Sequence, residues 1–178
     1  VILGGVPLAR IAPDRRAALV GYLPQRVAPA PGTVAQNVAL ARPQTDRGAV
    51  ARALRRAGLS EALARLPDGA ATCLAADGAP LSAGGIERLG LARALLGRPA
   101  LVILDTPLPS GGPAAAAEVA HLARDLAADG AMVIRIAPAI DAPGDCDRVL
   151  VLYRDMPVMA GAQPDPTPAG PAVPAGAA

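Results

Sequence analysis

Residues 81–105 read LSAGGIERLGLARALLGRPALVILD, and they combine two different structural patterns. The first part predicts a helix from about residue 84 to residue 96. The second part, residues 101–104, is a continuous apolar run, as expected of a strand buried in a parallel sheet, and it ends at Asp105. A helix followed closely by a buried strand indicates an α/β fold.

Downstream of Asp105 the same alternation continues. Residues 113–128 predict a helix with Val119, Leu122 and Leu126 on one face. Residues 132–136 predict another strand, which completes a strand, helix, strand unit, and residues 149–152 predict a last short strand. Pro and Gly dominate from residue 157 onward, so we expect residues 156–178 to form a disordered tail that builds no core.

Upstream of residue 81 the sequence predicts a β region followed by helices. Residues 19–23 form an apolar segment that indicates a strand. Thr33 can cap a helix that runs to residue 40, and Asp46 begins a second helical pattern that ends at Gly58. Residues 60–66 also favour a helix. The middle of the chain is therefore expected to be helical.

Composition excludes several classes of function. All 17 basic residues are arginine and the formal net charge is +2, with two tyrosines as the only aromatic residues, so we expect no nucleic-acid surface. Cys73 and Cys146 lack metal-ligand spacing and are expected to be isolated thiols. No stretch is long and apolar enough to span a membrane. Because much of the 52% hydrophobic content is alanine, which buries little area, we expect marginal stability.

Three segments carry a family resemblance through their order and separation. They are GYLPQ at residues 21–25 with PGTVAQNV at residues 31–38, LSAGGIERLGLARAL at residues 81–95, and LVILD at residues 101–105. Together they resemble the Q-loop, the signature motif and the Walker B strand of ATP-binding-cassette (ABC) transporter ATPases, with type I secretion exporters as the best match. The resemblance implies a partial RecA-like P-loop NTPase core with an inserted helical subdomain. It divides the chain into residues 1–32 (β region and Q-loop), 33–80 (helical subdomain), 81–155 (signature helix and Walker B core) and the tail.

The resemblance assigns cofactor-binding roles to Ser82, Ala83 and Gly84. In the family this element reaches across a dimer to the γ-phosphate bound by the other subunit, and unpaired N–H groups at a helix N-terminus favour an anion. In this chain Ala83 stands at the first paired glycine and Gly85 at the usual glutamine. The simpler interpretation is a helix whose N-cap is Ser82.

The resemblance also places Gln25 and Asp105 beside Mg²⁺, as weak metal ligands near the phosphates. A loop glutamine and a turn-capping aspartate are the simpler interpretations. Thr106 replaces the family's glutamate, and a hydroxyl is a poor general base. Pro138 occupies the position of the switch histidine and offers no side-chain donor. His121 is expected to lie within the preceding helix, as a surface or packing residue rather than a displaced switch histidine.

The family's phosphate loop, Gly-x-x-x-x-Gly-Lys-Ser/Thr, has no match in a chain without lysine. ATP and Mg²⁺ are the family's cofactors, and we expect these residues alone neither to bind ATP tightly nor to hydrolyse it. The expected partners are a transporter membrane domain and a second ATP-binding subunit, with a cytoplasmic location peripheral to the inner membrane. Two functions stay open: part of an ATPase that drives export, or a non-catalytic subunit or relic that docks on a membrane domain or an intact ATPase.

Overall fold

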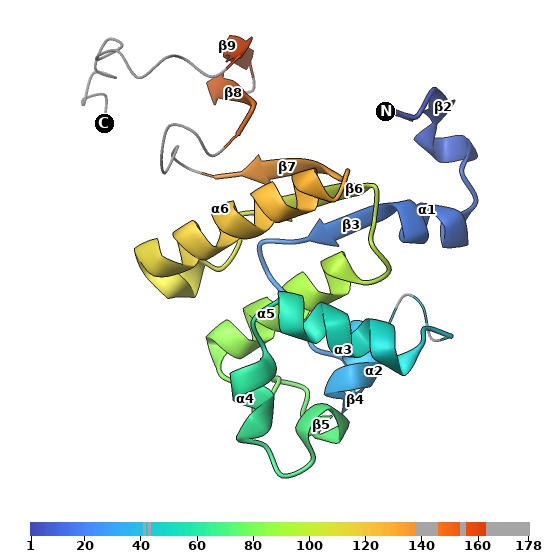
Figure 1. Ribbon diagram of the computed structural model, residues 1–178, viewed down its shortest axis with the longest axis vertical. Coiled ribbons are helices and arrows are strands. Elements are labelled where there is room, and N and C mark those ends of the chain that lie inside the picture. Colours follow the sequence, from blue (N-terminus) through green and yellow to red (C-terminus); the bar gives the residue numbers. More distant parts are fainter. Residues whose placement is uncertain (41, 43, 138–145, 154–155, 163–178) are drawn as a thin grey trace. The chain divides into compact units, whose positions relative to one another are not determined.

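The computed structural model describes residues 1–40, 42, 44–137, 146–153 and 156–162. It divides into two compact units, Val1–Pro138 and Ala139–Ala178. The first unit contains a parallel sheet and a group of helices (Figure 1). The described part of the second unit is a hairpin.

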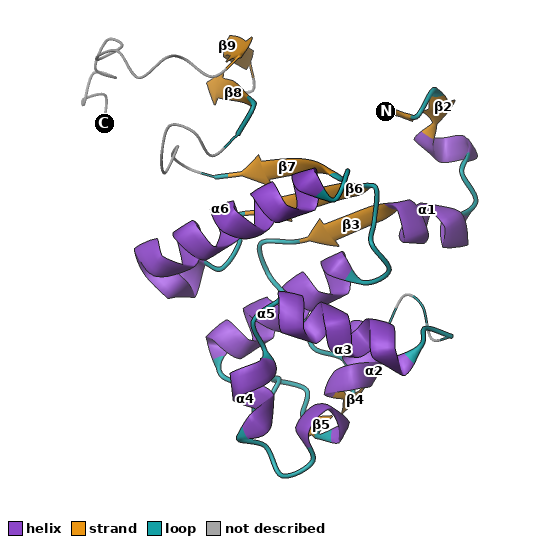
Figure 2. Ribbon diagram, viewed as in Figure 1, coloured by secondary structure: helices purple, strands orange, loops and turns teal. Residues whose placement is uncertain are grey.

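The sheet of the first unit has three parallel strands in the order β3-β6-β7 (Figure 2). Their bounds are β3 Val20–Leu23, β6 Leu101–Asp105 and β7 Met132–Ile136. The strands expected from the apolar runs therefore form, and β6 is central. The expected α/β fold is confirmed.

Two helices connect these strands and cover one face of the sheet. The helix α5 (Ala83–Leu95) precedes β6, and α6 (Gly112–Ala128) joins β6 to β7. Alternate strand residues point to opposite faces, so Leu23, Val102 and Leu104 share the covered face. All three are at most 2% exposed and belong to one buried cluster with side chains of α5 and α6.

The opposite face of the sheet carries exposed apolar side chains. Tyr22, Met132, Ile134 and Ile136 are between 44% and 64% exposed. Tyr22 is in register with Ile103 and Ile134, so these side chains form one continuous apolar surface. Both faces of a parallel sheet are normally covered, so this surface is unusual.

The helical region lies between β3 and α5, and its helices begin where the sequence predicts. Thr33 caps α2 (Val34–Val38) and forms a capping box with Gln36, and Asp46 caps α3 (Arg47–Arg56). The chain leaves α3 through Gly58, whose φ of +71° suits a glycine. The helix α4 (Ser60–Ala64) follows.

The smaller elements complete the description. They are β1 Ile2–Leu3, β2 Val6–Pro7, the 3₁₀ turns η1 Leu8–Arg10, η2 Gly69–Ala71 and η3 Pro109–Gly111, the helix α1 Pro13–Leu19, and the paired strands β4 Gly32–Thr33 and β5 Cys73–Leu74.

The C-terminal hairpin corrects one expectation. Residues 156–162 were expected to belong to a disordered tail, yet Met156–Ala162 forms β9, which pairs antiparallel with β8 (Arg148–Tyr153). Val158, Met159 and their alanine neighbours are compatible with a strand, and the pairing with β8 supplies the backbone partners that composition alone does not reveal. Residues 163–178 lie outside the described part.

Candidate nucleotide-binding site

The sheet brings Gln25 and Asp105 to the same edge. Leu23 is paired with Leu104, and Asp105, the last residue of β6, is paired with Ile136. Gln25 follows β3 by two residues and is exposed, whereas Asp105 is half-buried. Ligands of open parallel sheets bind outside the carboxyl ends of the strands, which is where both side chains begin. Pro138, expected just beyond β7, lies outside the described residues.

The loop after Asp105 has an unusual backbone conformation. Thr106 and Leu108 have φ values of +47° and +50°, a region that side chains rarely adopt. The Thr106 N–H donates to the carbonyl oxygen of Ile136 at 3.0 Å, and Leu108 is only 5% exposed. The hydrogen bond and the burial of Leu108 therefore hold a strained loop in place next to Asp105.

The N-terminus of α5 is capped and open to solvent. The Ser82 hydroxyl accepts a hydrogen bond from the Gly85 N–H at 3.2 Å, which confirms the N-cap interpretation of Ser82. Ser82 and Ala83 are exposed. A Cβ added to Gly84 would meet no atom within 4 Å, so space remains beside the first turn.

Replacing Ser82 with alanine is expected to lower the free energy of unfolding by about 1 kcal/mol, because the Gly85 N–H loses its acceptor. Urea unfolding followed by circular dichroism measures this change. Ser60→Ala is the matched control, because Ser60 begins α4 and makes no cap there. Equal effects at both positions would contradict the capping role.

Close contact between α5 and β3 fixes the position of α5. A Cβ on Gly21 would overlap the backbone carbonyl of Ala94, and a Cβ on Gly90 would overlap Val27 and lie 2.9 Å from Leu23 Cδ1. Only glycine therefore allows the helix to approach the strand this closely. The N-terminus of α5 is thus open, while the C-terminal half of the helix is packed tightly against β3 and Val27.

A buried polar cluster joins α2, α5 and the chain that follows Gln25. Asn37 is 1% exposed; its side chain accepts from the Ala30 N–H at 2.8 Å and donates to the Ala30 carbonyl oxygen at 2.8 Å. Arg93 donates to the Asn37 side chain at 2.6 Å, to the Asn37 carbonyl oxygen at 2.7 Å and to the Ala28 carbonyl oxygen at 2.7 Å. Burial lowers the pKa of Arg93 from its ordinary value. Sequence reasoning gave no role to either residue.

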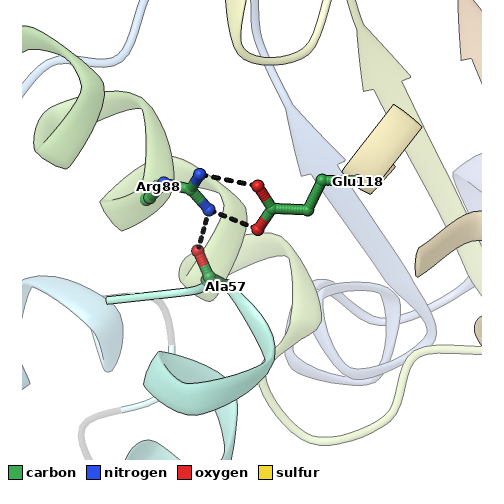
Figure 3. A network of polar contacts seen from close by, with 3 residues as sticks. All are labelled: Ala57, Arg88 and Glu118. Atoms are coloured by element: carbon green, nitrogen blue, oxygen red, sulfur yellow. Dashed lines mark hydrogen bonds and ion pairs between the residues drawn. The ribbon is translucent and has the colours of Figure 1, made fainter. Parts of the chain in front are cut away.

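A second polar cluster joins α5 to α6 (Figure 3). The Arg88 guanidinium donates to the two carboxylate oxygens of Glu118 at 2.6 and 2.7 Å, and to the carbonyl oxygen of Ala57 at 3.1 Å. The hydrogen bond from Arg88 lowers the pKa of Glu118, and the same bond raises the pKa of Arg88. The sequence pattern gives no signal for this pair either.

Acid pH is expected to weaken this pair. A carboxyl group whose pKa is lower in the folded chain stabilises the fold above its unfolded pKa of about 4.3, and that contribution is lost as the pH falls through the folded pKa. Wild type should therefore lose more stability between pH 5 and pH 3 than Glu118→Gln does. Urea unfolding at each pH measures the difference, and parallel pH curves would contradict it.

Two other chemically notable residues of the first unit lie on other elements, His121 on α6 and Cys73 on β5. His121 is exposed, with its Nε2 3.8 Å from Asp125 Oδ2, so the expected surface position is confirmed. Cys73 is an exposed free thiol, and Cys146 is half-buried. In the described ranges no group of three or more His, Cys, Asp or Glu residues could hold a metal ion, and none of the helices there could cross a membrane.

A cavity of about 260 Å³ lies elsewhere, beside the end of α1, the start of β3 and the end of α5. Arg42 and Arg93 border it, and both donate to backbone carbonyl oxygens. Neither Ser82 nor Asp105 lines it. We therefore place the candidate site at the edge of the sheet and the N-terminus of α5.

Comparison with known proteins gives consistent matches. A family model described as "ABC transporter" matches residues 1–109. The chain is 36% identical over 155 residues to the type I secretion system ATP-binding protein PrsD of Rhizobium meliloti, covering 85% of this chain and 26% of that protein. It is 33% identical over 134 residues to a multidrug efflux ATP-binding/permease protein of Mycobacterium bovis, covering 75% of this chain and 11% of that protein.

A solved structure agrees with these matches. The structure of a bacterial Atm1-family ABC exporter with ATP bound superposes with a TM-score of 0.72 at 28% identity, over 83% of this chain and 25% of that one. The chain thus spans only about a quarter or less of each of these proteins.

Proposed function

Because this chain belongs to the ABC transporter family, we propose that it works by presenting the N-terminus of α5 to ATP held by a second ATP-binding subunit. The chain corresponds to part of an exporter ATP-binding domain with a partial P-loop NTPase core, and the family binds ATP and Mg²⁺. One observation carries the proposal: the first turn of α5 is open at Gly84, while the C-terminal half of the same helix is packed tightly against β3.

The open turn suits a phosphate group. The first N–H groups of a helix have no partner within the helix, and the helix dipole favours negative charge there. Ser82 can supply a hydroxyl, and Ala83 and Gly84 are small enough to permit close approach. The remaining N–H groups are directed along the helix axis, toward a ligand that approaches from outside the chain.

Gln25 and Asp105 offer oxygen ligands of the kind that Mg²⁺ prefers. Magnesium usually takes one or two protein carboxylates and completes its shell with water and substrate phosphates, so one carboxylate and one amide at this edge fit it only together with a nucleotide. Bound Mg²⁺ would neutralise phosphate charge. Thr106 is a poor base, so we propose that this chain contributes binding rather than water activation.

The exposed sheet face fits the same assembly. Met132, Ile134 and Ile136 lie on β7, which is paired on one side only in the described sheet. We propose that, in the working ATP-binding domain, a further strand pairs with the open edge of β7 and a helix that follows a phosphate loop covers this face. We also propose that the ATP-binding domain docks on an exporter membrane domain, consistent with the ATP-binding/permease names of the relatives.

The test measures association of this chain with a complete ATP-binding domain from a related exporter, by sedimentation velocity, with and without Mg-ATP. We expect association only with Mg-ATP, and no tight binding of fluorescent ATP by this chain alone. Gly84→Leu should abolish association while leaving unfolding nearly unchanged, because no atom lies within 4 Å of the added Cβ. The matched control is Ala127→Leu, at an exposed position in the last turn of α6. Tight ATP binding by the chain alone, or association unaffected by Gly84→Leu, would refute the proposal.

A further inference from the structure

Three segments of the first unit meet at one guanidinium group. Arg88 belongs to α5 and lies about one and a half turns from Ser82. Ala57 is the C-cap of α3, and Glu118 belongs to α6, the helix that follows the Asp105 loop. Figure 3 shows the two carboxylate oxygens and the Ala57 carbonyl oxygen around the Arg88 side chain. We call Arg88, Glu118 and Ala57 the arginine clamp.

The local backbone is shaped around the arginine clamp. Gly58 follows Ala57, and a Cβ there would overlap the Arg88 guanidinium and lie 2.9 Å from Glu118 Oε1. Gly58 also has a φ of +71°, which disfavours other residues. The turn after α3 therefore leaves room for the guanidinium, and the Ala57 carbonyl oxygen, free at the helix end, accepts from it.

A neighbouring contact ties the same turn of α5 to the same downstream segment. The Ser110 hydroxyl donates to the carboxylate of Glu87. Glu87 and Arg88 are adjacent on α5, while Ser110 precedes α6 and Glu118 lies in its second turn. Two successive residues of α5 thus hold the segment that leaves the Asp105 loop.

The geometry of the pair favours a fixed orientation. A guanidinium that binds both oxygens of one carboxylate makes two parallel charge-assisted bonds, which restrain rotation as well as distance. The side chains are 25% and 46% exposed, so water screens the pair and its direct contribution to stability is small. The main effect of the Arg88–Glu118 pair is therefore to fix the position of α5 relative to α6.

We propose that Arg88 is a positioning residue that sets the N-terminus of α5 relative to the Asp105 loop through Glu118 and Ala57. In the proposed function, which this inference rests on, the N-terminus of α5 faces ATP held by a second subunit. Arg88 would keep this N-terminus at a fixed position relative to the Asp105 loop, and so correctly oriented toward that subunit.

The deciding experiment measures the distance between α5 and α6 in the full chain without nucleotide or partner. Spin labels are attached at Ala83→Cys and Ala117→Cys, both exposed positions, in a chain whose two native cysteines are serine. Pulsed electron resonance should give one narrow distance distribution. Arg88→Met and Glu118→Gln should both broaden it or shift it, and Arg88→Lys should restore it only in part, because lysine cannot bind two oxygens and the carbonyl in the same way.

The matched control is the Arg65–Glu61 ion pair, which joins Glu61 of α4 to the C-cap residue of the same helix, with side chains 70% and 83% exposed. Arg65→Met and Glu61→Gln should leave the distribution unchanged. An unchanged distribution in both Arg88→Met and Glu118→Gln would overturn the proposal. So would loss of the far-ultraviolet circular dichroism signal in both, because the pair would then determine folding rather than position.

A second measurement connects position to function. Glu118→Gln should weaken Mg-ATP-dependent association with the complete ATP-binding domain about fivefold, as expected for one partly exposed ion pair. Unchanged association would confine the role to the free chain and overturn the functional part of the inference. If wild type does not associate at all, the proposed function fails, while the distance measurement still decides whether Arg88 positions α5.

Discussion

Gly21→Val is expected to lower the free energy of unfolding by about 3 kcal/mol, the upper part of the range for overpacked cores. Any Cβ at position 21 would overlap the Ala94 carbonyl, and the Pro99 ring lies only 3.0 Å from the same point. A helix backbone cannot move aside as a flexible side chain can. The whole of α5 would have to lift from β3, which exposes Leu23 and neighbouring core residues. Urea unfolding followed by circular dichroism measures the loss.

Gly84→Ala is the matched control for this prediction. Gly84 also belongs to the first unit, but a Cβ there meets nothing within 4 Å. Alanine should stabilise α5 by up to about 1 kcal/mol, since glycine is a poor helix former. If Gly21→Val were as stable as wild type, close contact between α5 and β3 would not be what positions the signature helix.

Asn37→Ala is expected to cost about 3 kcal/mol of unfolding free energy, because it leaves several buried groups without partners. The Ala30 N–H loses its acceptor, the Ala30 carbonyl oxygen loses its donor, and Arg93 loses one of its three acceptors. The loss includes a charged donor, and burial has already partly desolvated its side chain, so the unpaired state is costly. The measurement is again urea unfolding.

Gln36→Ala provides the comparison, since Gln36 directly precedes Asn37 on α2 and its side chain accepts a hydrogen bond from the exposed Thr33 N–H. Its loss should cost about 1 kcal/mol or less. Hydrogen exchange gives an independent check: in Asn37→Ala the Ala30 amide should lose protection, while amides of β6 should keep theirs relative to global unfolding. Equal costs for the two substitutions would show that the buried cluster contributes no more than an ordinary cap.

The sequence predicted the regular elements well because each has a local signal. Thr33 and Asp46 are helix caps, Gly58 ends a helix, and the continuous apolar run before Asp105 is the central strand. The family resemblance implied that Gln25 and Asp105 lie near one Mg²⁺, and the parallel strands β3 and β6 do end at the same edge of the sheet. Residues 156–162 were misjudged because their composition resembles the rest of the tail, and strand pairing with β8 is not visible in composition.

The polar clusters could not be predicted for a different reason. Arg93 and Asn37 are 56 positions apart, and Arg88 and Glu118 are 30 apart. Both arginines lie in the signature segment, and the chain has 15 other arginines. Hydrophobic periodicity does not reveal which arginine side chain is partly buried or which groups it binds. A weak signal existed for Asn37: it lies one helical turn after the Thr33 cap, on the side that carries the buried Val34 and Val38.

The pairing of β3 with β6 also governs the order in which the molecule can fold. Val20 pairs with Leu101, which is synthesised about 80 residues later. At common translation rates, the interval between the synthesis of the two residues is roughly 4 to 16 seconds. The helices α2, α3 and α5 contact one another, so they can pack together before Leu101 is synthesised. The strand β3 therefore has no strand partner in the sheet until the central strand β6 emerges.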